Sequence, residues 1–528
     1  MTNDQREARI IDLDSEDGEV GPGVLSMPGP SPAQLLMGLV VVAAAVALAF
    51  GPLGVVHGPA GRSPAPSPVG VTVPPLESFG PVPTDGQVAL DGWPVTFDPQ
   101  YDQSVSVGPD GTVYLGHLAG LDATGHPRAG WLTLADGTHA RPCAFGSDGT
   151  IYGDTIKDNG THNIWIFGSD DKLRFSSAVE VLDYSQVVPG PGGSVYFVIP
   201  SPGDPAGSTI QIVAPNGSGA TIVTPGMVND AAVGGDGTIY LTILTIVNEP
   251  QVFVGYSLRI LSPNGEQVAK DSEPVWWGMA LAPDGTLYAW GYDRASSDDP
   301  VADQSRIAAF DSDGRLKPGW PITFRGGISA PRFGPDGTVY LISDYSSVVA
   351  LGPDGRSRAG WPVSLPAGET VMSGTDGPAA PAMAQAPIVD DTGRVYVTTT
   401  DLHDQGMVVA FDASGAASPG WALPLDASPV SFVVAPDSSA GSVFVRLPSG
   451  QGRIYIALAD KIEAVDENGN PVPGWPLSSP GVNFAVWQGM WATQDGGLIV
   501  EVATAPSSIG GGPENRLYRL PPDGQLVK

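Results

Sequence analysis

One short phrase recurs along this chain of 528 residues and restricts its fold more than any other feature. "GPDGTVYL" begins at Gly108 and again at Gly334, and close variants begin at Gly146, Gly234 and Ala282. Asp-Gly supplies the positive φ that a tight hairpin turn needs, and the run of β-branched and aromatic residues after it favours a strand. The phrase therefore predicts an all-β protein built from repeated hairpins.

The spacing of the phrase predicts the architecture. Nine copies align on the turn glycine, and successive copies are 38 to 59 residues apart. Each copy is followed by a second apolar strand and a second tight turn, which gives four strands in each unit. Such a unit with such a period is typical of a β-propeller, so we expect a single propeller of eight or nine four-stranded blades over residues 88–528. The aligned glycines are Gly111, Gly149, Gly193, Gly237, Gly285, Gly337, Gly393, Gly452 and Gly496.

A tryptophan recurs near the end of several units, in phrases such as "RAGWPVSL". Because its place in the unit is constant, we expect it to pack between neighbouring blades, with ligand stacking as the alternative. These tryptophans are Trp131, Trp320, Trp361, Trp421 and Trp475.

The two ends of the repeat region complement each other. "VALDGWPVTF", at residues 88–97, resembles a fourth strand with no unit before it, and the chain ends four residues after Gly524, where the last fourth strand would begin. We expect these fragments to complete one blade together, which would close the ring and remove an exposed strand edge.

The segment before the repeats predicts a membrane anchor. Residues 34–56 form an uncharged, mostly apolar stretch that would reach about 34 Å as a helix, enough to cross a hydrocarbon layer of about 30 Å. A cleaved signal peptide is the alternative, since "ALA" at Ala47–Ala49 could be a cleavage site. Seven acidic residues within the first 19 favour an uncleaved signal anchor instead.

The flanking segments complete the predicted organisation. Residues 1–33 form an acidic tail that we expect to be disordered, and residues 57–87 form a linker rich in Pro and Gly. The flanking charges do not decide the orientation of the helix. Size and composition favour a single-pass protein of the cell membrane with its propeller on the extracytoplasmic side.

Charge and cysteine content exclude several classes of partner. The chain has 56 acidic and 25 basic residues, a net charge of −31, which opposes binding to the phosphate backbone of nucleic acid. Its one cysteine, Cys143, excludes an intramolecular disulfide and a thiolate metal cluster.

The unit "YLISDYSSVVALGPDGRSRAGWPVSL" resembles the repeats of the pyrroloquinoline-quinone-like, or quinoprotein-type, propeller superfamily. The resemblance implies the propeller fold. Quinone-binding enzymes of that superfamily place a pair of neighbouring cysteines over the cofactor, which a single cysteine cannot supply. The resemblance therefore implies a non-enzymatic member, and we expect no cofactor.

Two groups of residues are candidates for a site. Four aspartates lie in a variable connection at residues 290–305 and could bind calcium through their oxygens, although their spacing matches no defined loop and a solvated acidic loop is the alternative. They are Asp293, Asp298, Asp299 and Asp303. The second group could form a binding face for a peptide or glycan, with packing in inner strands as the alternative for the tryptophans. It comprises Trp276, Trp277, Trp487, Trp491 and His403.

We therefore expect a membrane-anchored extracytoplasmic propeller that binds a protein or another macromolecule, or acts as a scaffold. The alternative is a propeller enzyme, either a metal-dependent hydrolase or lyase or a quinoprotein-like oxidoreductase. A sensor that signals through the helix to the acidic tail is a third hypothesis. An enzyme needs carboxylates, histidine or a metal converging near the channel, whereas a binder needs only an exposed patch.

Overall fold

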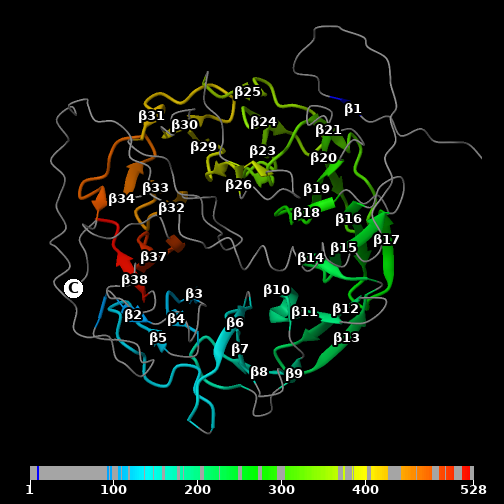
Figure 1. Ribbon diagram of the computed structural model, residues 1–528, viewed down its shortest axis with the longest axis vertical. Coiled ribbons are helices and arrows are strands. Elements are labelled where there is room, and N and C mark those ends of the chain that lie inside the picture. Colours follow the sequence, from blue (N-terminus) through cyan, green and yellow to red (C-terminus); the bar gives the residue numbers. More distant parts are fainter. Residues whose placement is uncertain are drawn as a thin grey trace, which may run out of the picture. The chain divides into compact units, whose positions relative to one another are not determined.

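The computed structural model of the chain is an all-β propeller (Figure 1). It describes residues 9–10 and, between residues 92 and 523, the strands and most of the turns that join them. Residues 1–8, 11–91 and 524–528, with parts of the longer connections, lie outside the described residues. They include the predicted linker, the predicted membrane segment at 34–56 and most of the acidic tail. In the part that is described, no helix has the length and hydropathy of a membrane span.

Nine antiparallel sheets form the blades, which we number 1 to 9 in chain order. Blade 1 has three strands, β3 (Val105–Val107), β4 (Val113–Leu115) and β5 (Ala119–Leu121). The next three blades have four strands each, in sequence order. Blade 2 is β6 (Arg141–Phe145), β7 (Ile151–Ile156), β8 (His162–Phe167) and β9 (Val179–Val181). Blade 3 is β10 (Gln186–Pro189), β11 (Val195–Ser201), β12 (Gly207–Val213) and β13 (Gly219–Val223). Blade 4 is β14 (Val228–Val233), β15 (Ile239–Val247), β16 (Phe253–Leu261) and β17 (Gln267–Asp271).

Blades 5 to 8 repeat this meander. Blade 5 is β18 (Trp276–Leu281), β19 (Leu287–Asp293), β20 (Gln304–Phe310) and β21 (Ile322–Arg325). Blade 6 is β22 (Arg332–Phe333), β23 (Val339–Ser343), β24 (Ser347–Leu351) and β25 (Val363–Ser364). Blade 7 is β28 (Ile388–Val389), β29 (Val395–Thr400), β30 (Gly406–Phe411) and β31 (Leu423–Pro424). Blade 8 is β32 (Ser442–Arg446), β33 (Gly452–Ala457), β34 (Lys461–Asp466) and β35 (Leu477–Ser478).

Blade 9 joins the two ends of the repeat region, as the sequence predicts. Its strands are β36 (Trp487–Ala492), β37 (Leu498–Thr504), β38 (Glu514–Leu520) and, as the fourth, β2 (Val95–Phe97). β2 pairs antiparallel with β38, with Val95 opposite Leu517. The expected count of eight or nine blades is therefore resolved to nine.

Three short elements lie outside the blade meanders. A 3-10 turn, η1 (Pro191–Gly193), joins β10 to β11, and a two-stranded ribbon of β26 (Ser373–Gly374) and β27 (Met383–Ala384) lies between blades 6 and 7 in the sequence. β1 (Arg9–Ile10) pairs parallel with the outer strand β21 of blade 5. An outer blade edge in this structure thus accepts an added strand.

The recurrent turn has a local cause in its sequence. In the copy at Gly337 the Asp336 carboxylate accepts hydrogen bonds from the backbone N–H of Thr338, at 3.0 Å, and from its hydroxyl, at 2.8 Å. Gly337 has a φ of 77°, a conformation that glycine adopts without strain. The same aspartate bond to the residue two positions later recurs at Asp110, Asp148, Asp236 and Asp284.

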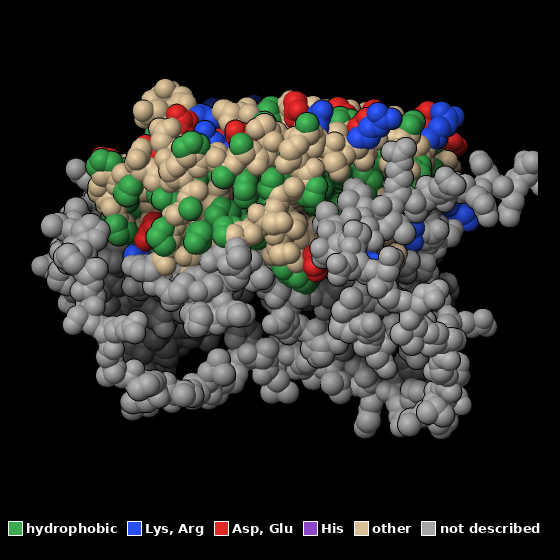
Figure 2. All heavy atoms as spheres, turned by 90° about the horizontal axis from the view of Figure 1, so that it is seen from above, with side chains coloured by type: hydrophobic (Ala, Val, Ile, Leu, Met, Phe, Trp, Pro, Cys, Tyr) green, Lys and Arg blue, Asp and Glu red, His purple; other side chains and the backbone are tan. Residues whose placement is uncertain are grey.

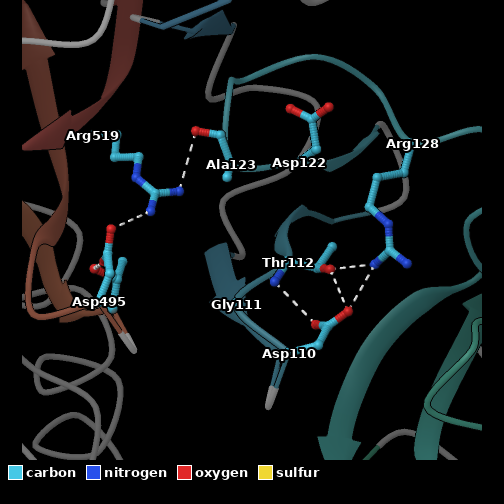
Figure 3. A pocket seen from close by; sticks show the side chains of 9 residues that line it. Asp110, Gly111, Thr112, Asp122, Ala123, Arg128, Asp495 and Arg519 are labelled. Carbon is cyan, nitrogen blue, oxygen red and sulfur yellow. Dashed lines mark hydrogen bonds and ion pairs between the residues drawn. The ribbon is translucent and has the colours of Figure 1, made fainter. Parts of the chain in front are cut away.

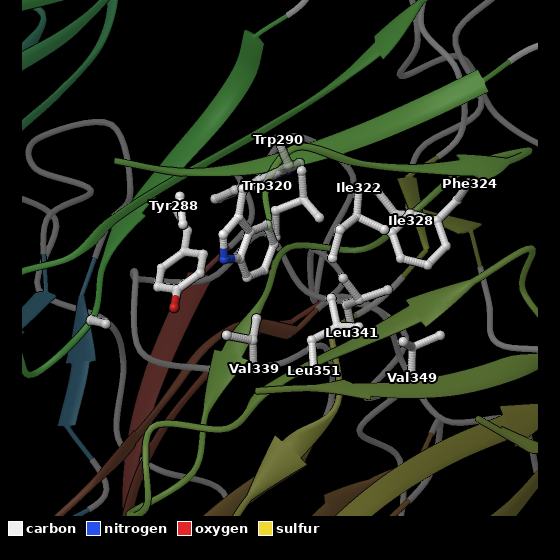
Figure 4. Close-up of a cluster of buried hydrophobic side chains, with 13 residues drawn as sticks. Tyr288, Trp290, Trp320, Ile322, Phe324, Ile328, Val339, Leu341, Val349 and Leu351 are labelled. Carbon is white, nitrogen blue, oxygen red and sulfur yellow. The ribbon is translucent and has the colours of Figure 1, made fainter. Parts of the chain in front are cut away.

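Nine clusters of buried hydrophobic side chains join successive blades, and the last joins blade 9 to blade 1. In the cluster of Figure 4, Tyr288 and Trp320 of blade 5 pack against Val339 and Leu341 of blade 6. The core of the propeller is thus a ring of interfaces between blades, not one central core.

The repeated tryptophans lie in these interfaces, as predicted. Trp131, Trp320, Trp361, Trp421 and Trp475 are 4–7% exposed. The indole N–H of Trp320 donates to the Pro353 carbonyl of the following blade at 3.0 Å. Trp93, Trp361, Trp421 and Trp475 make the same bond to the corresponding turn of the next blade, at 3.0–3.3 Å.

Candidate binding surface

The short turns of the blades carry paired charges. Arg358 lies over the first turn of its own blade, with its guanidinium 3.2 Å from the Asp336 carboxylate and 3.0 Å from the Thr338 hydroxyl. Arg128 is paired in the same way with Asp110 at 3.0 Å, and Arg519 with Asp495 at 2.7 Å. Figure 2 shows acidic and basic side chains next to each other along one edge of the view. Several surface carboxylates are therefore already neutralised within the fold.

A pocket of about 370 Å³ lies among these turns, at the seam between blades 9 and 1 (Figure 3). Its lining includes Arg128 and Arg519, each with its paired aspartate, together with Asp122. Asp122 accepts hydrogen bonds from the Thr124 hydroxyl at 2.6 Å and from the Thr124 and His126 backbone N–H groups. The Thr124 hydroxyl is the main cause that lowers the pKa of Asp122. The polar groups of the pocket thus satisfy one another, in the arrangement seen at other blade turns.

A buried polar cluster lies between blades 2 and 3. Asp154, 1% exposed, receives two hydrogen bonds from the Arg141 guanidinium at 2.8 and 2.9 Å. The Nδ1 atom of His162 lies 2.7 Å from the same carboxylate, and the Tyr184 hydroxyl donates to it at 2.9 Å. Cys143 donates its thiol hydrogen to the Tyr152 carbonyl at 3.4 Å. An acid, a histidine and an arginine therefore do converge in this molecule.

The protonation states of the cluster follow from burial and charge. Burial alone would raise the pKa of Asp154, but the hydrogen bonds and charge of Arg141, with His162 and Tyr184, hold it below its usual value. Burial, more than the nearby Asp154 charge, raises the pKa of the Cys143 thiol, and burial is also the main cause that raises the pKa of the Tyr184 hydroxyl. At neutral pH the aspartate is ionised and engaged, while the thiol and the phenol stay protonated, so neither is an activated nucleophile.

Sequence reasoning missed this cluster. Arg141, Asp154 and His162 lie on three strands, and Tyr184 comes from the connection to the next blade. One signal was available: "IYGDTI" puts Asp154 where the copy "VYLISD" has the apolar Ile342. A charge at a core position of a repeat marks a departure from the pattern.

The tryptophans proposed for a binding face have different environments. Trp276 is 1% exposed and packs edge-on against Phe310 of its own blade, with Arg306 over its ring. Its ring is thus enclosed in the interface of blades 4 and 5, which is the packing role left open by the sequence. Trp277 is half-buried and meets Tyr256 edge-on at 5.2 Å. Trp491 is half-buried against the cluster of blades 9 and 1.

The remaining candidates are not tested by the structure. His403, Asp298, Asp299 and Asp303 lie outside the described residues, as do the side chains of Asp293 and Trp487. Within the described part of the chain, no group of three or more His, Cys, Asp or Glu side chains is arranged to hold a metal ion. Calcium binding by the acidic connection therefore stays a prediction.

The outer rim of blade 3 differs from the charged turn surface. Val223, in the outer strand β13, is 79% exposed. Thr221 and Ala220 in the same strand are also exposed. From Gln186 to Asn229 the sequence contains one charged residue, Asp204, whereas 15% of the whole chain is charged. This uncharged outer edge, residues 219–223, is hereafter called the blade 3 rim.

Comparison with known proteins finds similar solved structures but no matching sequence. No protein-family model and no curated protein sequence matches the chain. Solved structures do. BamB from Moraxella catarrhalis is 14% identical, with 71% of this chain and 95% of that chain covered and a TM-score of 0.36. A eukaryotic initiation factor is 9% identical, with 80% and 93% covered and a TM-score of 0.47.

A quinohemoprotein alcohol dehydrogenase from Comamonas testosteroni is also similar, at 11% identity, with 72% and 74% of the chains covered and a TM-score of 0.36. The propeller fold that the sequence resemblance implied is present in the structure itself, as nine antiparallel blades. At these identities and TM-scores, the likeness says nothing about the partner or the activity of this chain.

Proposed function

We propose that this chain is a binding or scaffold propeller whose partner is a protein or another macromolecule. The observation that carries the proposal is the blade 3 rim, an uncharged strand edge of a strongly acidic protein on which Val223 is 79% exposed. A strand edge that carries no charge is open to pairing with another chain. The variable connections, many of which lie outside the described residues, offer further positions for contacts.

A membrane location is the second part of the proposal. Residues 34–56 would anchor the chain in the cell membrane and place the propeller on the extracytoplasmic side. A spanning segment there would separate Arg9–Ile10 from the propeller, so it is incompatible with the pairing of β1 and β21. Protease digestion of intact cells, with epitopes at both ends of the chain, decides between the two arrangements. The proposal expects the C-terminal epitope to be digested and the N-terminal epitope to be protected.

The alternative of a propeller enzyme is favoured by one observation, the pairing of His162 with Asp154. A catalytic role of this pair is opposed by Arg141 and Tyr184, which also donate hydrogen bonds to the Asp154 carboxylate. Metal analysis of the purified full chain, with thermal unfolding in calcium and in chelator, tests the metal-dependent form. The binding proposal expects neither stoichiometric metal nor a shift of the unfolding temperature.

Co-purification from native membranes in mild detergent tests the binding proposal directly. We expect a partner at constant stoichiometry with the wild-type chain. We expect it to be lost when Thr221 and Val223 are both changed to Lys, because two charges would be desolvated in the contact. A matched double change to Lys at Gln267 and Val268, on the outer strand of blade 4, should leave the partner bound. Absence of any partner from the wild-type chain would refute the proposal.

A further inference from the structure

We propose that β13 at the blade 3 rim binds an extended, uncharged peptide segment of a partner protein, which adds to blade 3 as a fifth strand. This inference rests on the proposed binding function and specifies its mode. In such strand addition, backbone hydrogen bonds supply affinity and alternate side chains supply specificity.

The backbone of β13 has the required geometry. The Thr224 N–H donates to the Ser208 carbonyl at 2.9 Å, and Ile222 lies opposite Ile210 in the same register. Because hydrogen-bonded and non-hydrogen-bonded pairs alternate in an antiparallel ladder, Ile222 and Ala220 direct their N–H and C=O groups toward β12. The backbone N–H and C=O groups of Thr221 and Val223 therefore point away from blade 3, where an added strand could pair with them. The side chains of these two residues are exposed, and an added strand would contact them.

Other outer strands are already paired or carry features that discourage strand addition. β21 has four residues, including Arg325, and already pairs with β1. β25, β31 and β35 have two residues each, and β9 has three, including Glu180. β17 is as long as β13 but has a register shift next to Val268 and carries Lys270. Bulges, charges and short lengths are the usual means of blocking an edge. Among the described outer strands that end a blade, β13 is the one with five residues, a regular register and no charge.

Charge and area identify the occupant. A second copy of the chain would bring another net charge of −31, and an edge of five residues offers far less than the roughly 1,200 Å² that stable interfaces bury. A short peptide does not carry that charge and needs no such area. The absence of charged residues on the described rim favours an uncharged segment, and the exposed Val223 favours apolar or β-branched residues at alternate positions.

The test measures peptide binding to the full chain in detergent by fluorescence anisotropy. The probe is a short capped peptide of alternating Thr and Val with a fluorophore on a neutral spacer. The matched control peptide is N-methylated at alternate residues, which removes the hydrogen bonds of an added strand and keeps the side chains. We expect saturable binding of the probe and a loss of at least about 10-fold in affinity for the N-methylated peptide.

Protein variants locate the site. Val223→Lys and Thr221→Pro should each weaken probe binding by about 10-fold or more, because the first places a charge in the contact and the second removes an outward N–H. Val268→Lys on β17 should leave it unchanged. Equal affinity for both peptides, or equal loss with Val268→Lys, would overturn the proposal.

Two further outcomes separate this inference from the function on which it rests. If the probe does not bind and Val223→Lys instead dissociates a dimer in sedimentation velocity, the occupant is a second copy and the inference is wrong. If the probe does not bind but the native partner still co-purifies with Val223→Lys, strand addition is refuted while the binding function stands.

Discussion

The recurrent tryptophan of the blade, exemplified by Trp361, stabilises the interface with the next blade by packing and by a hydrogen bond. Trp361 packs against Tyr340 and Phe411, with ring centroids 5.5 and 6.1 Å away, and its indole N–H bonds to the Ala413 carbonyl of the next blade at 3.2 Å. The side chain thus contributes both apolar burial and a hydrogen bond to one interface.

We predict that Trp361→Phe lowers the free energy of unfolding by about 1–3 kcal/mol, since it removes that hydrogen bond and part of the buried ring. Trp361→Ala should cost about 3–5 kcal/mol because it also leaves a cavity. Urea denaturation measures both changes. The control Val223→Ala, at an exposed position, should stay within about 0.5 kcal/mol of wild type. An equal effect of all three variants would contradict the assigned role.

Asp154 gives a pH-dependent prediction. Its pKa is lowered in the folded protein, so the ionised carboxylate stabilises the fold above about pH 4, and this contribution is lost as the pH falls through the lowered pKa. Asp154→Asn should therefore cost about 3 kcal/mol at pH 7, because it leaves Arg141 without its buried partner. The cost should shrink toward pH 3. Thermal unfolding at several pH values measures it, with Asp354→Asn at an exposed turn as the control; a cost independent of pH would contradict this role.

At the scale of the strand, the three residues of β2 join the two ends of the ring of blades. Val95, with no exposed surface, pairs opposite Leu517 and packs between blades 9 and 1. The two partners are separated in sequence by almost the whole propeller, so one short strand closes the ring of blade interfaces.

We predict that Val95→Ala destabilises the protein by about 1–3 kcal/mol. Val95→Asp would bury a charge. It should separate blade 9 from blade 1 and expose both blades to protease, while blades 4 to 6 stay resistant. Limited proteolysis with identification of the first cleavage sites measures this. First cleavage in blades 4 to 6 would show that β2 does not close the ring.

The elements were predictable from the sequence to different degrees. The Asp-Gly turns and the "TVYL" strands were readable because their cause is local, as the Asp336 bonds to Thr338 show. The composition of blade 9 was predictable because the last repeat unit lacks a fourth strand and the segment at residues 88–97 resembles a fourth strand with no unit before it. The Asp154 cluster was not, since Tyr184 reaches it only once two blades pack. The regular edge of β13 also needed the structure, because the sequence does not show that Val268 of β17 lies at a register shift.

At the scale of the whole molecule, the net charge of −31 opposes the compact state. We predict that raising the salt concentration from about 10 mM to about 300 mM increases the unfolding temperature, because it screens this repulsion. Differential scanning calorimetry of the full chain measures it. The paired turn charges, such as Arg358 with Asp336, should weaken over the same range, but exposed pairs contribute little. A lower unfolding temperature in salt would mean that these pairs outweigh the general repulsion.

The central claim is that the acidic propeller binds a macromolecular partner at the uncharged rim of blade 3. Site-specific photo-crosslinking in native cells tests it most directly, with the photoreactive residue placed at position 221 or 223 on the rim and at position 354 on the charged turn surface. The account predicts one and the same crosslinked partner from both rim positions and none from position 354. No crosslink from the rim, or the same products from all three positions, would contradict it.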